Sequence, residues 1–183
     1  MGNTESGPAT NDRPIPLALE GASLLERGFY EAAVGKFKRS YELYKESGAC
    51  SSAGRSLRLA AEAGLQMTAP DYELAATAFE EVGVLYLTNE ITAFSAASVA
   101  FSNTLLCLLA AGRIATAKGK LADFAAKLGT FESSIDGLAA KTIMEAYQNG
   151  NRSQCLDRVL AFKDCLVMPG WRSLLLDKIV DRL

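Results

Sequence analysis

Two arginines at helical spacing could attract an acidic partner. Arg55 and Arg58 lie in the segment "CSSAGRSLRLAAEAG" at residues 50–64, where apolar or small residues at three- and four-residue spacing predict one helix. Side chains three residues apart project from neighbouring points of a helix surface. The two guanidinium groups therefore either face an acidic surface or form ion pairs with Glu46 or Glu62, and both interpretations are open.

No residue pattern indicates catalysis or metal binding. The chain has no histidine, which removes histidine-dependent catalysis and the commonest transition-metal ligand. Tyrosines, cysteines and carboxylates occur only at ordinary helix-surface spacing. The cysteines lack C-x-x-C spacing, and their apolar neighbours predict burial in a reducing compartment; they are Cys50, Cys107, Cys155 and Cys165. We predict a protein that is not an enzyme, without catalytic residues, cofactor or metal.

Length and composition predict one globular domain. The chain has 183 residues, enough for a full core, and its net charge of −2 argues against a nucleic-acid binder. No apolar run approaches the roughly eighteen residues of a membrane helix, and no secretory leader pattern is found near the start. Residues 1–15 are polar and rich in Gly, Pro and Asn, which predicts a flexible tail; residues 16–183 form the predicted helical-repeat domain.

One eight-residue pattern recurs along the chain. "YEAAVGKF" at residues 30–37 returns as "YELAATAF" at 72–79 and "IATAKGKL" at 114–121, each forty-two residues on, and faintly as "SQCLDRVL" at 153–160. Small or apolar residues at the third and fourth positions allow a neighbouring helix to come close. A generic helical bundle is the alternative, but undrifting spacing favours stacked helical hairpins. We predict an all-α fold, a tetratricopeptide-like right-handed solenoid of antiparallel helix pairs that ends in a small helical bundle.

Charge is segregated along this array. Residues 27–58 contain seven basic and three acidic residues, whereas residues 59–112 contain six acidic residues and no basic one. Solvated surface explains most runs of charge. On a solenoid, however, a one-sided block is also typical of a surface that faces something acidic.

Five stretches together resemble the soluble NSF attachment proteins (SNAPs) of the alpha and beta type. "YEAAVGKFKRSYELYKESGACSSAGRSLRLAA" followed by "DYELAATAFEEVG" is similar to the middle of those proteins. "FSAASVAFSNTLLCLL", "MEAYQNGNRSQCLDRVLAFKDC" and "WRSLLLDKIVDRL" match their last helices in order and nearly in spacing. The resemblance covers roughly residues 17–183 and indicates a shortened, divergent member that matches the C-terminal two-thirds of the family.

The resemblance implies an adaptor of vesicle trafficking. SNAPs are curved helical sheets that wrap a syntaxin-type SNARE four-helix bundle after membrane fusion and recruit the ATPase NSF, which pulls the bundle apart. It implies the SNARE complex and NSF as partners, no small-molecule substrate, and a cytoplasmic location peripheral to endomembranes. Because the bundle surface is acidic, basic residues would bind it; these are Arg55 and Arg58, with Lys36 and Arg39. The residues implied for contact with NSF are Glu145 and Leu183.

The sequence also departs from the family pattern. Ala97 and Ser102 stand where alpha-type members have lysines, and Gln148 and Asn149 replace two acids of the cluster that faces NSF. The chain ends at "VDRL", without the family's acidic tail. The alternative function is therefore a helical-repeat interaction scaffold that has lost NSF recruitment and binds another protein.

The first residues contain a candidate lipidation signal. "MGNTES" fits the pattern M-G-x-x-x-[ST], so Gly2 would be N-myristoylated after removal of Met1. One acyl chain binds a membrane only marginally, with an association constant on the order of 10⁴ M⁻¹. The expected association with membranes is therefore peripheral at most.

Overall fold

A computed structural model describes residues 13–89 and 93–183, and every regular element within those residues is helical. In chain order these elements are α1 (Pro14–Glu26), α2 (Tyr30–Glu46), α3 (Cys50–Gly64), α4 (Tyr72–Asn89), α5 (Phe94–Ala110), α6 (Ile114–Lys127), the short 3₁₀ helix η1 (Phe131–Ser133), α7 (Ile135–Gln148), α8 (Arg152–Cys165) and α9 (Gly170–Asp181). The predicted all-α class is confirmed.

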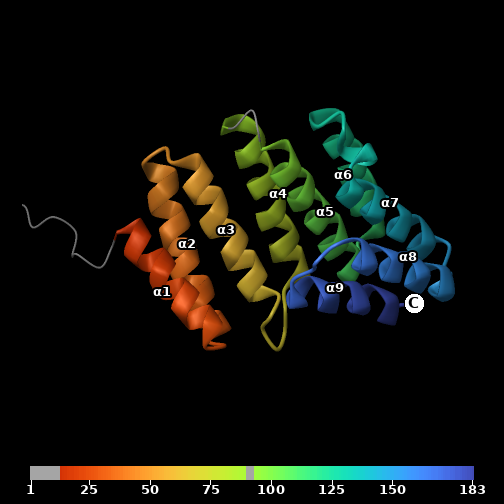
Figure 1. The fold of residues 1–183 in the computed structure, drawn as a ribbon, viewed down its shortest axis with the longest axis horizontal. Helices are drawn as coiled ribbons and strands as arrows, with labels where there is room; N and C mark the ends of the chain where they lie inside the picture. The colour runs from red at the N-terminus through yellow and green to blue at the C-terminus, as the bar shows by residue number, and fades with distance from the viewer. Residues whose placement is uncertain (1–12, 90–92) are drawn as a thin grey trace, which may run out of the picture.

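Successive helices stand side by side in an elongated array (Figure 1). From α1 to α5 each helix packs against the next one, and neighbouring helices run antiparallel. From α5 onwards the arrangement changes, because α5 contacts α6, α7 and α9, and α8 contacts α7 and α9. The predicted helical-repeat solenoid with a bundle at its C-terminal end is therefore confirmed.

The forty-two-residue repeat corresponds to the even-numbered helices. α2, α4 and α6 begin at residues 30, 72 and 114, the first residues of the three clear sequence copies. A small side chain at the fourth position of each copy lets a neighbouring helix approach, and these residues are all buried: Ala33, Ala75 and Ala117.

The fourth copy is shifted by one residue from its predicted position. α8 begins at Arg152, one residue before the predicted copy at 153–160. Cys155 and Val159 are fully buried, whereas Leu156 and Leu160 are 38% and 48% exposed. A shift of one residue rotates the buried side of a helix by about 100°. The smaller side chains thus lie where α8 must approach α7 and α9.

Four turns between helices place glycine in the left-handed region of backbone conformation. Gly112, between α5 and α6, has a φ of 78°. Its N–H donates to the carbonyl oxygen of Leu109 at 2.9 Å, and the N–H of Arg113 donates to that of Leu108 at 2.8 Å. This Schellman arrangement satisfies the last carbonyl groups of a helix. The same backbone conformation recurs at Gly28, Gly48 and Gly150.

α5 is buried on almost all sides. Thirteen of its 17 residues are buried. α4 approaches it at Gly83, where an added Cβ would lie 2.3 Å from Cε1 of Phe101. Phe101 in turn stacks on Phe124 of α6, with ring centroids 4.2 Å apart. The absence of a side chain at Gly83 therefore sets the distance between α4 and α5.

α1 begins inside the segment predicted to be a tail. Pro14 occupies the first helical position, where its fixed φ suits a helix and its missing N–H is not needed. The hydroxyl of Ser40 on α2 donates to the carbonyl oxygen of Pro14 at 2.8 Å. Residues 14 and 15 of the predicted tail therefore belong to α1, and residues 1–12 lie outside the described part of the chain.

The contact at Gly83 is tested by Gly83→Ala. We expect this variant to lower the free energy of unfolding by about 1–3 kcal/mol, because the added methyl group overlaps the ring of Phe101. The matched control is Gly119→Ala on α6, where an added Cβ meets nothing within 4 Å. The control should raise stability by about 0.5–1 kcal/mol through helix propensity. Urea unfolding followed by circular dichroism measures both, and equal stability of the two variants would refute the close contact.

Candidate protein-binding surface

α3 presents its residues to two separate hollows of the surface. The apolar stripe noted in the sequence lines a groove between α2 and α4. Arg55 and Arg58 line a pocket beside α5 and α9. Because a helix turns once in 3.6 residues, these two sides of α3 diverge, and the stripe and the arginines serve different surfaces.

The pocket between α3, α5 and α9, called here the arginine pocket, has a volume of about 380 Å³. Its charged and polar lining is Arg55, Arg58, Glu62, Asn103 and Arg172. Its aromatic and apolar lining is Tyr86, Ala96, Val99, Ala100, Pro169 and Trp171. The fold thus brings the last helix beside two arginines that lie far earlier in the chain.

The two arginines predicted as a pair have different surroundings. Nη1 of Arg58 donates to Oε1 of Glu62 at 2.6 Å, four residues on in the same helix. Arg55 is exposed, and its side chain has no ion pair or hydrogen bond among the described residues. The intramolecular interpretation therefore applies to Arg58 with Glu62, whereas Arg55 is available to a partner.

Glu62 depends on Arg58 for its charge. Its side chain is 13% exposed, and burial raises the pKa of its carboxyl above the ordinary value. The charge and hydrogen bond of Arg58, and the charge of Arg172, act in the opposite direction without cancelling that effect. The ionised carboxylate is therefore costly at this place without a cation beside it.

Arg172 on α9 is the pocket residue that sequence reasoning missed. It is 5% exposed, and its Nη2 donates to Oδ1 of Asp136 at 2.7 Å and to Oγ of Ser102 at 3.3 Å. Its guanidinium group also lies over the ring of Phe162, 4.9 Å from the centroid. The signal in the sequence is an arginine at the head of the apolar run "WRSLLL", which is usually interpreted as a surface position.

Arg172 supplies a positive charge beside α5, where the family resemblance places lysines. Ala97 and Ser102, which stand at those lysine positions, are both fully buried. The hydroxyl of Ser102 donates to the carbonyl oxygen of Asp136 at 3.0 Å and accepts the hydrogen bond from Arg172. The guanidinium group beside α5 therefore comes from α9, and Asp136 compensates its charge.

Lys36 and Arg39 lie on α2 and do not line the arginine pocket. Nζ of Lys36 is 2.9 Å from Oε2 of Glu20 on α1. Nη1 of Arg39 is 3.3 Å from Oε2 of Glu42 on α2 itself. The structure therefore brings together two of the four residues predicted to bind a SNARE bundle, and the other two lie on another helix beside acidic side chains.

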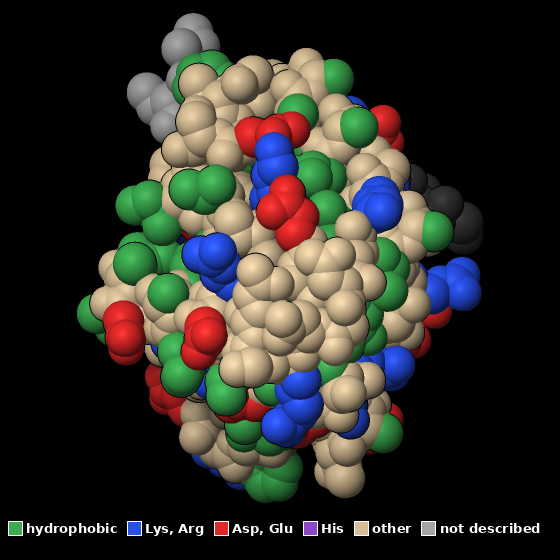
Figure 2. All heavy atoms as spheres, turned by 90° about the vertical axis from the view of Figure 1, so that its right-hand side faces the viewer, with side chains coloured by type: hydrophobic (Ala, Val, Ile, Leu, Met, Phe, Trp, Pro, Cys, Tyr) green, Lys and Arg blue, Asp and Glu red, His purple; other side chains and the backbone are tan. Residues whose placement is uncertain are grey.

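The residues predicted to face NSF lie at the C-terminal end of the molecule. Glu145 is exposed on α7, and Leu183 is partly buried against the main core. Figure 2 views the molecule from this end and shows acidic and basic side chains interspersed rather than gathered by sign. Between α8 and α9, Lys163 and Asp177 form an ion pair at 2.6 Å.

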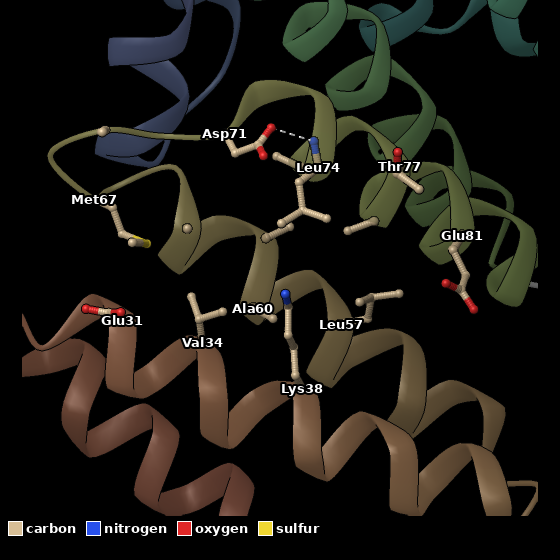
Figure 3. Close-up of a pocket in the computed structure, with 15 residues that line it drawn as sticks. Glu31, Val34, Lys38, Leu57, Ala60, Met67, Asp71, Leu74, Thr77 and Glu81 are labelled. Atoms are coloured by element: carbon tan, nitrogen blue, oxygen red, sulfur yellow. Dashed lines mark hydrogen bonds between the residues drawn. The ribbon is translucent and has the colours of Figure 1, made fainter.

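The groove between α2 and α4 has an apolar floor and charged ends. Its volume is about 370 Å³, and α3 forms the floor. Figure 3 shows Val34 and Leu57 pointing into the groove, with Lys38 reaching in from α2. Glu31 and Glu81 lie toward its two ends. Such a surface can take apolar side chains of another protein while polar groups bind around them.

Some acidic and basic residues that are segregated along the sequence form ion pairs between repeats in the structure. Glu81 on α4 meets Lys45 of α2 at 2.8 Å, and Glu80 on α4 meets Lys120 of α6 at 2.7 Å. The partners are 36 and 40 residues apart, about one repeat. Two acids of the 59–112 block are thus paired with cations of neighbouring repeats within the chain.

Gly2, the predicted lipidation site, lies outside the described residues. Within ranges 13–89 and 93–183, no helix is long and apolar enough to cross a bilayer, and no acidic or cysteine cluster is placed to hold a metal ion. Cys107 and Cys155 are buried as predicted. The prediction was wrong for Cys165, which is exposed because it is the last residue of α8, and Cys50 is only partly buried.

Tyr41, Lys45 and Glu81 form a hydrogen-bonded triad between α2 and α4. Burial acts to raise the pKa of Glu81, but hydrogen bonds from Lys45 and Tyr41, with the charge of Lys45, outweigh it and the pKa is lowered. A lowered carboxyl pKa contributes stability above the unfolded-state value of about 4.3. That stability is lost as the pH falls through the folded-state pKa.

Glu81→Gln should therefore lower the free energy of unfolding at neutral pH by about 0.5–1 kcal/mol, a modest value because the triad is partly exposed to solvent. The difference from wild type should shrink as the pH falls below about 4. Glu73→Gln, which removes a longer exposed contact with Arg113 at 3.5 Å, is the control and should change stability little. Urea unfolding at neutral and acidic pH measures the effect, and a difference independent of pH would contradict it.

The sequence was compared with known protein families and with curated proteins. The family described as "Soluble NSF attachment protein, SNAP" matches residues 18–183. A search of curated proteins found no significant match. The matched region contains α3, α5 and α9, and with them the whole arginine pocket. The chain therefore belongs to the soluble NSF attachment protein family.

Proposed function

We propose that this protein is an adaptor of vesicle trafficking and membrane fusion that binds a SNARE four-helix bundle and recruits the ATPase NSF for its disassembly. Membership of the SNAP family supports a SNAP-like, non-enzymatic role in general. The observation that carries the finer proposal is Arg55, an exposed guanidinium group without a partner in the described chain, which lies beside Arg58 at one pocket.

The proposed contact with the bundle is electrostatic. Arg55 can offer all five of its N–H donors to carboxylates of an acidic partner. Arg58 contributes only the donors that Glu62 leaves free. Lys36 and Arg39 contribute less in this proposal, because each already has an acidic neighbour. Attraction of this kind weakens with salt, since the screening length is about 10 Å at 0.1 M ionic strength.

Recruitment of NSF is supported by family membership and by the exposure of Glu145. Leu183 offers only part of its surface, because it packs against the core. The interspersed charges at this end of the molecule (Figure 2) favour the alternative function, a scaffold that has lost NSF recruitment and binds another protein. The apolar groove between α2 and α4 is the surface that such a partner would use.

In this proposal the protein works in the cytoplasm, peripheral to endomembranes, where SNARE bundles remain after fusion. Myristoylation of Gly2 would add a weak attachment, and SNARE binding would supply the second one that stable anchoring needs. We expect mass spectrometry of the protein from its native cell to show an acylated N-terminal glycine. An unmodified glycine would remove the lipid from the proposal.

Charge reversal at the arginine pocket tests SNARE binding. At low salt we expect Arg55→Glu to reduce capture by an immobilised SNARE bundle about tenfold, and Arg55→Glu with Arg58→Glu to abolish it. Arg55→Glu should not disturb folding, since Arg55 has no partner in the described chain, and circular dichroism verifies this. The control, Lys118→Glu with Lys178→Glu, changes net charge equally at exposed lysines of α6 and α9 and should bind like wild type.

Addition of NSF to the same capture experiment separates the two functions. Salt-sensitive capture that also retains NSF would support the full adaptor, whereas capture without NSF would support the alternative. Capture that survives both arginine reversals but is lost with Leu74→Glu, an exposed side chain in the groove, would overturn the proposed contact.

A further inference from the structure

The arginine pocket carries positive charge that the chain itself does not neutralise. Three arginines and one carboxylate line it. Arg58 pairs with Glu62, and Arg172 pairs with Asp136, which is not part of the lining. Arg55 has no counter-ion among the described residues. One net positive charge therefore remains after both ion pairs are counted.

Two polar atoms of residues that line the pocket are buried without a hydrogen-bond partner. Oδ1 of Asn103 and Nε of Arg172 belong to residues that are 2% and 5% exposed, and neither atom is paired within the described chain. A buried polar group without a partner costs about 1–3 kcal/mol, so such groups normally have a ligand or water. One atom is an acceptor and the other a donor. Both atoms are closed to solvent, so only the other polar groups of these two side chains can reach a pocket ligand.

The pocket is too large for a lone anion. Its volume of about 380 Å³ can hold a ring with several substituents, of which one carboxylate or phosphate group would fill a small part. Tyr86, Val99 and Trp171 give it aromatic and apolar walls. The faces of a compact ring can lie against such walls while the substituents reach the polar residues.

We propose that the arginine pocket binds a phosphorylated polyol of the inositol phosphate class, either as a soluble molecule or as the headgroup of a lipid. A phosphomonoester has about −1.5 to −2 charge and three acceptor oxygens at neutral pH. Guanidinium groups bind such oxygens in pairs, whereas a carboxylate has only two oxygens to share. Phosphate oxygens bind Arg55, Arg58 and Arg172, and an oxygen of a ring substituent accepts a hydrogen bond from the side-chain amide of Asn103.

Glu62 competes with this ligand for Arg58. Its carboxylate occupies one Arg58 donor at 2.6 Å and adds a negative charge to the pocket lining. Burial already opposes the ionised form of this carboxyl and raises its pKa. Replacement by the isosteric neutral amide should therefore free Arg58 and strengthen binding. A gain of this kind cannot arise from a damaged fold.

The experiment titrates inositol trisphosphate into the full chain by calorimetry, with fluorescence of Trp171, the single tryptophan, as a second readout. Wild type should bind one equivalent. Arg55→Gln and Asn103→Leu should each weaken binding about tenfold, and Glu62→Gln should strengthen it about threefold. Lys118→Gln removes one exposed charge of α6 and should bind like wild type.

Vesicles of phosphatidylcholine, with and without phosphatidylinositol bisphosphate, distinguish the two sources of the ligand. Sedimentation with the phosphorylated vesicles alone would indicate the lipid headgroup, and calorimetric binding without sedimentation would indicate the soluble molecule. Absence of heat with wild type, or equal binding by Lys118→Gln, Arg55→Gln and Asn103→Leu, would overturn the proposal.

The pocket ligand and the proposed SNARE contact share Arg55 and Arg58 but can fail separately. Asn103 is 2% exposed, so it does not reach the surface of a protein partner. Asn103→Leu should therefore lose inositol trisphosphate and keep capture by the SNARE bundle. If wild type binds inositol trisphosphate but not the bundle, the adaptor function falls and the pocket ligand stands.

Discussion

The burial of α5 is the constraint on which the rest of the fold depends. Thirteen of its 17 residues are buried, so it must be covered on every side rather than along one stripe. α4 covers one side, and α6, α7 and α9 cover the others. Phe101, Phe124 and Phe131 fill the space between α5, α6 and η1, with ring centroids 4.2 to 6.1 Å apart. Because α5 must be covered on every side, the linear array of helices ends in a bundle at its C-terminal end (Figure 1).

The same demand creates the arginine pocket. α9 must return to cover α5, and it thereby brings Trp171 and Arg172 beside α3. A charge that is only 5% exposed would be strongly destabilising alone, and Asp136 compensates it. Arginine suits this place better than lysine because a planar guanidinium group can lie over Phe162 while it donates hydrogen bonds at its edge. The packing of α9 that closes the core therefore also forms the pocket.

Ion pairs between repeats use part of the charge that is segregated along the chain. α2 and α4 are separated by the groove whose floor is α3, and the pair of Lys45 with Glu81 spans the two helices. On the other side of α4, Glu80 receives Lys120 of α6. Each pair is partly exposed and contributes little stability alone. Their spacing, close to one repeat, makes a block of one sign complementary to the next block, and Arg55 remains outside this pairing.

The sequence by itself determined the helices and their forty-two-residue period, because these depend on residues close together in the chain. It also put Arg55 and Arg58 on one side of one helix. Only the tertiary structure decided what that side faces. Arg172 lies beside it and is held there by hydrogen bonds to Asp136 and Ser102, which are 36 and 70 positions away in the sequence. The register of α8 was decided in the same way: the local pattern favoured two leucines, but packing against α7 and α9 buries Cys155 and Val159. Local patterns are fixed by neighbours in sequence, whereas the pocket and the register depend on helices that meet only after folding.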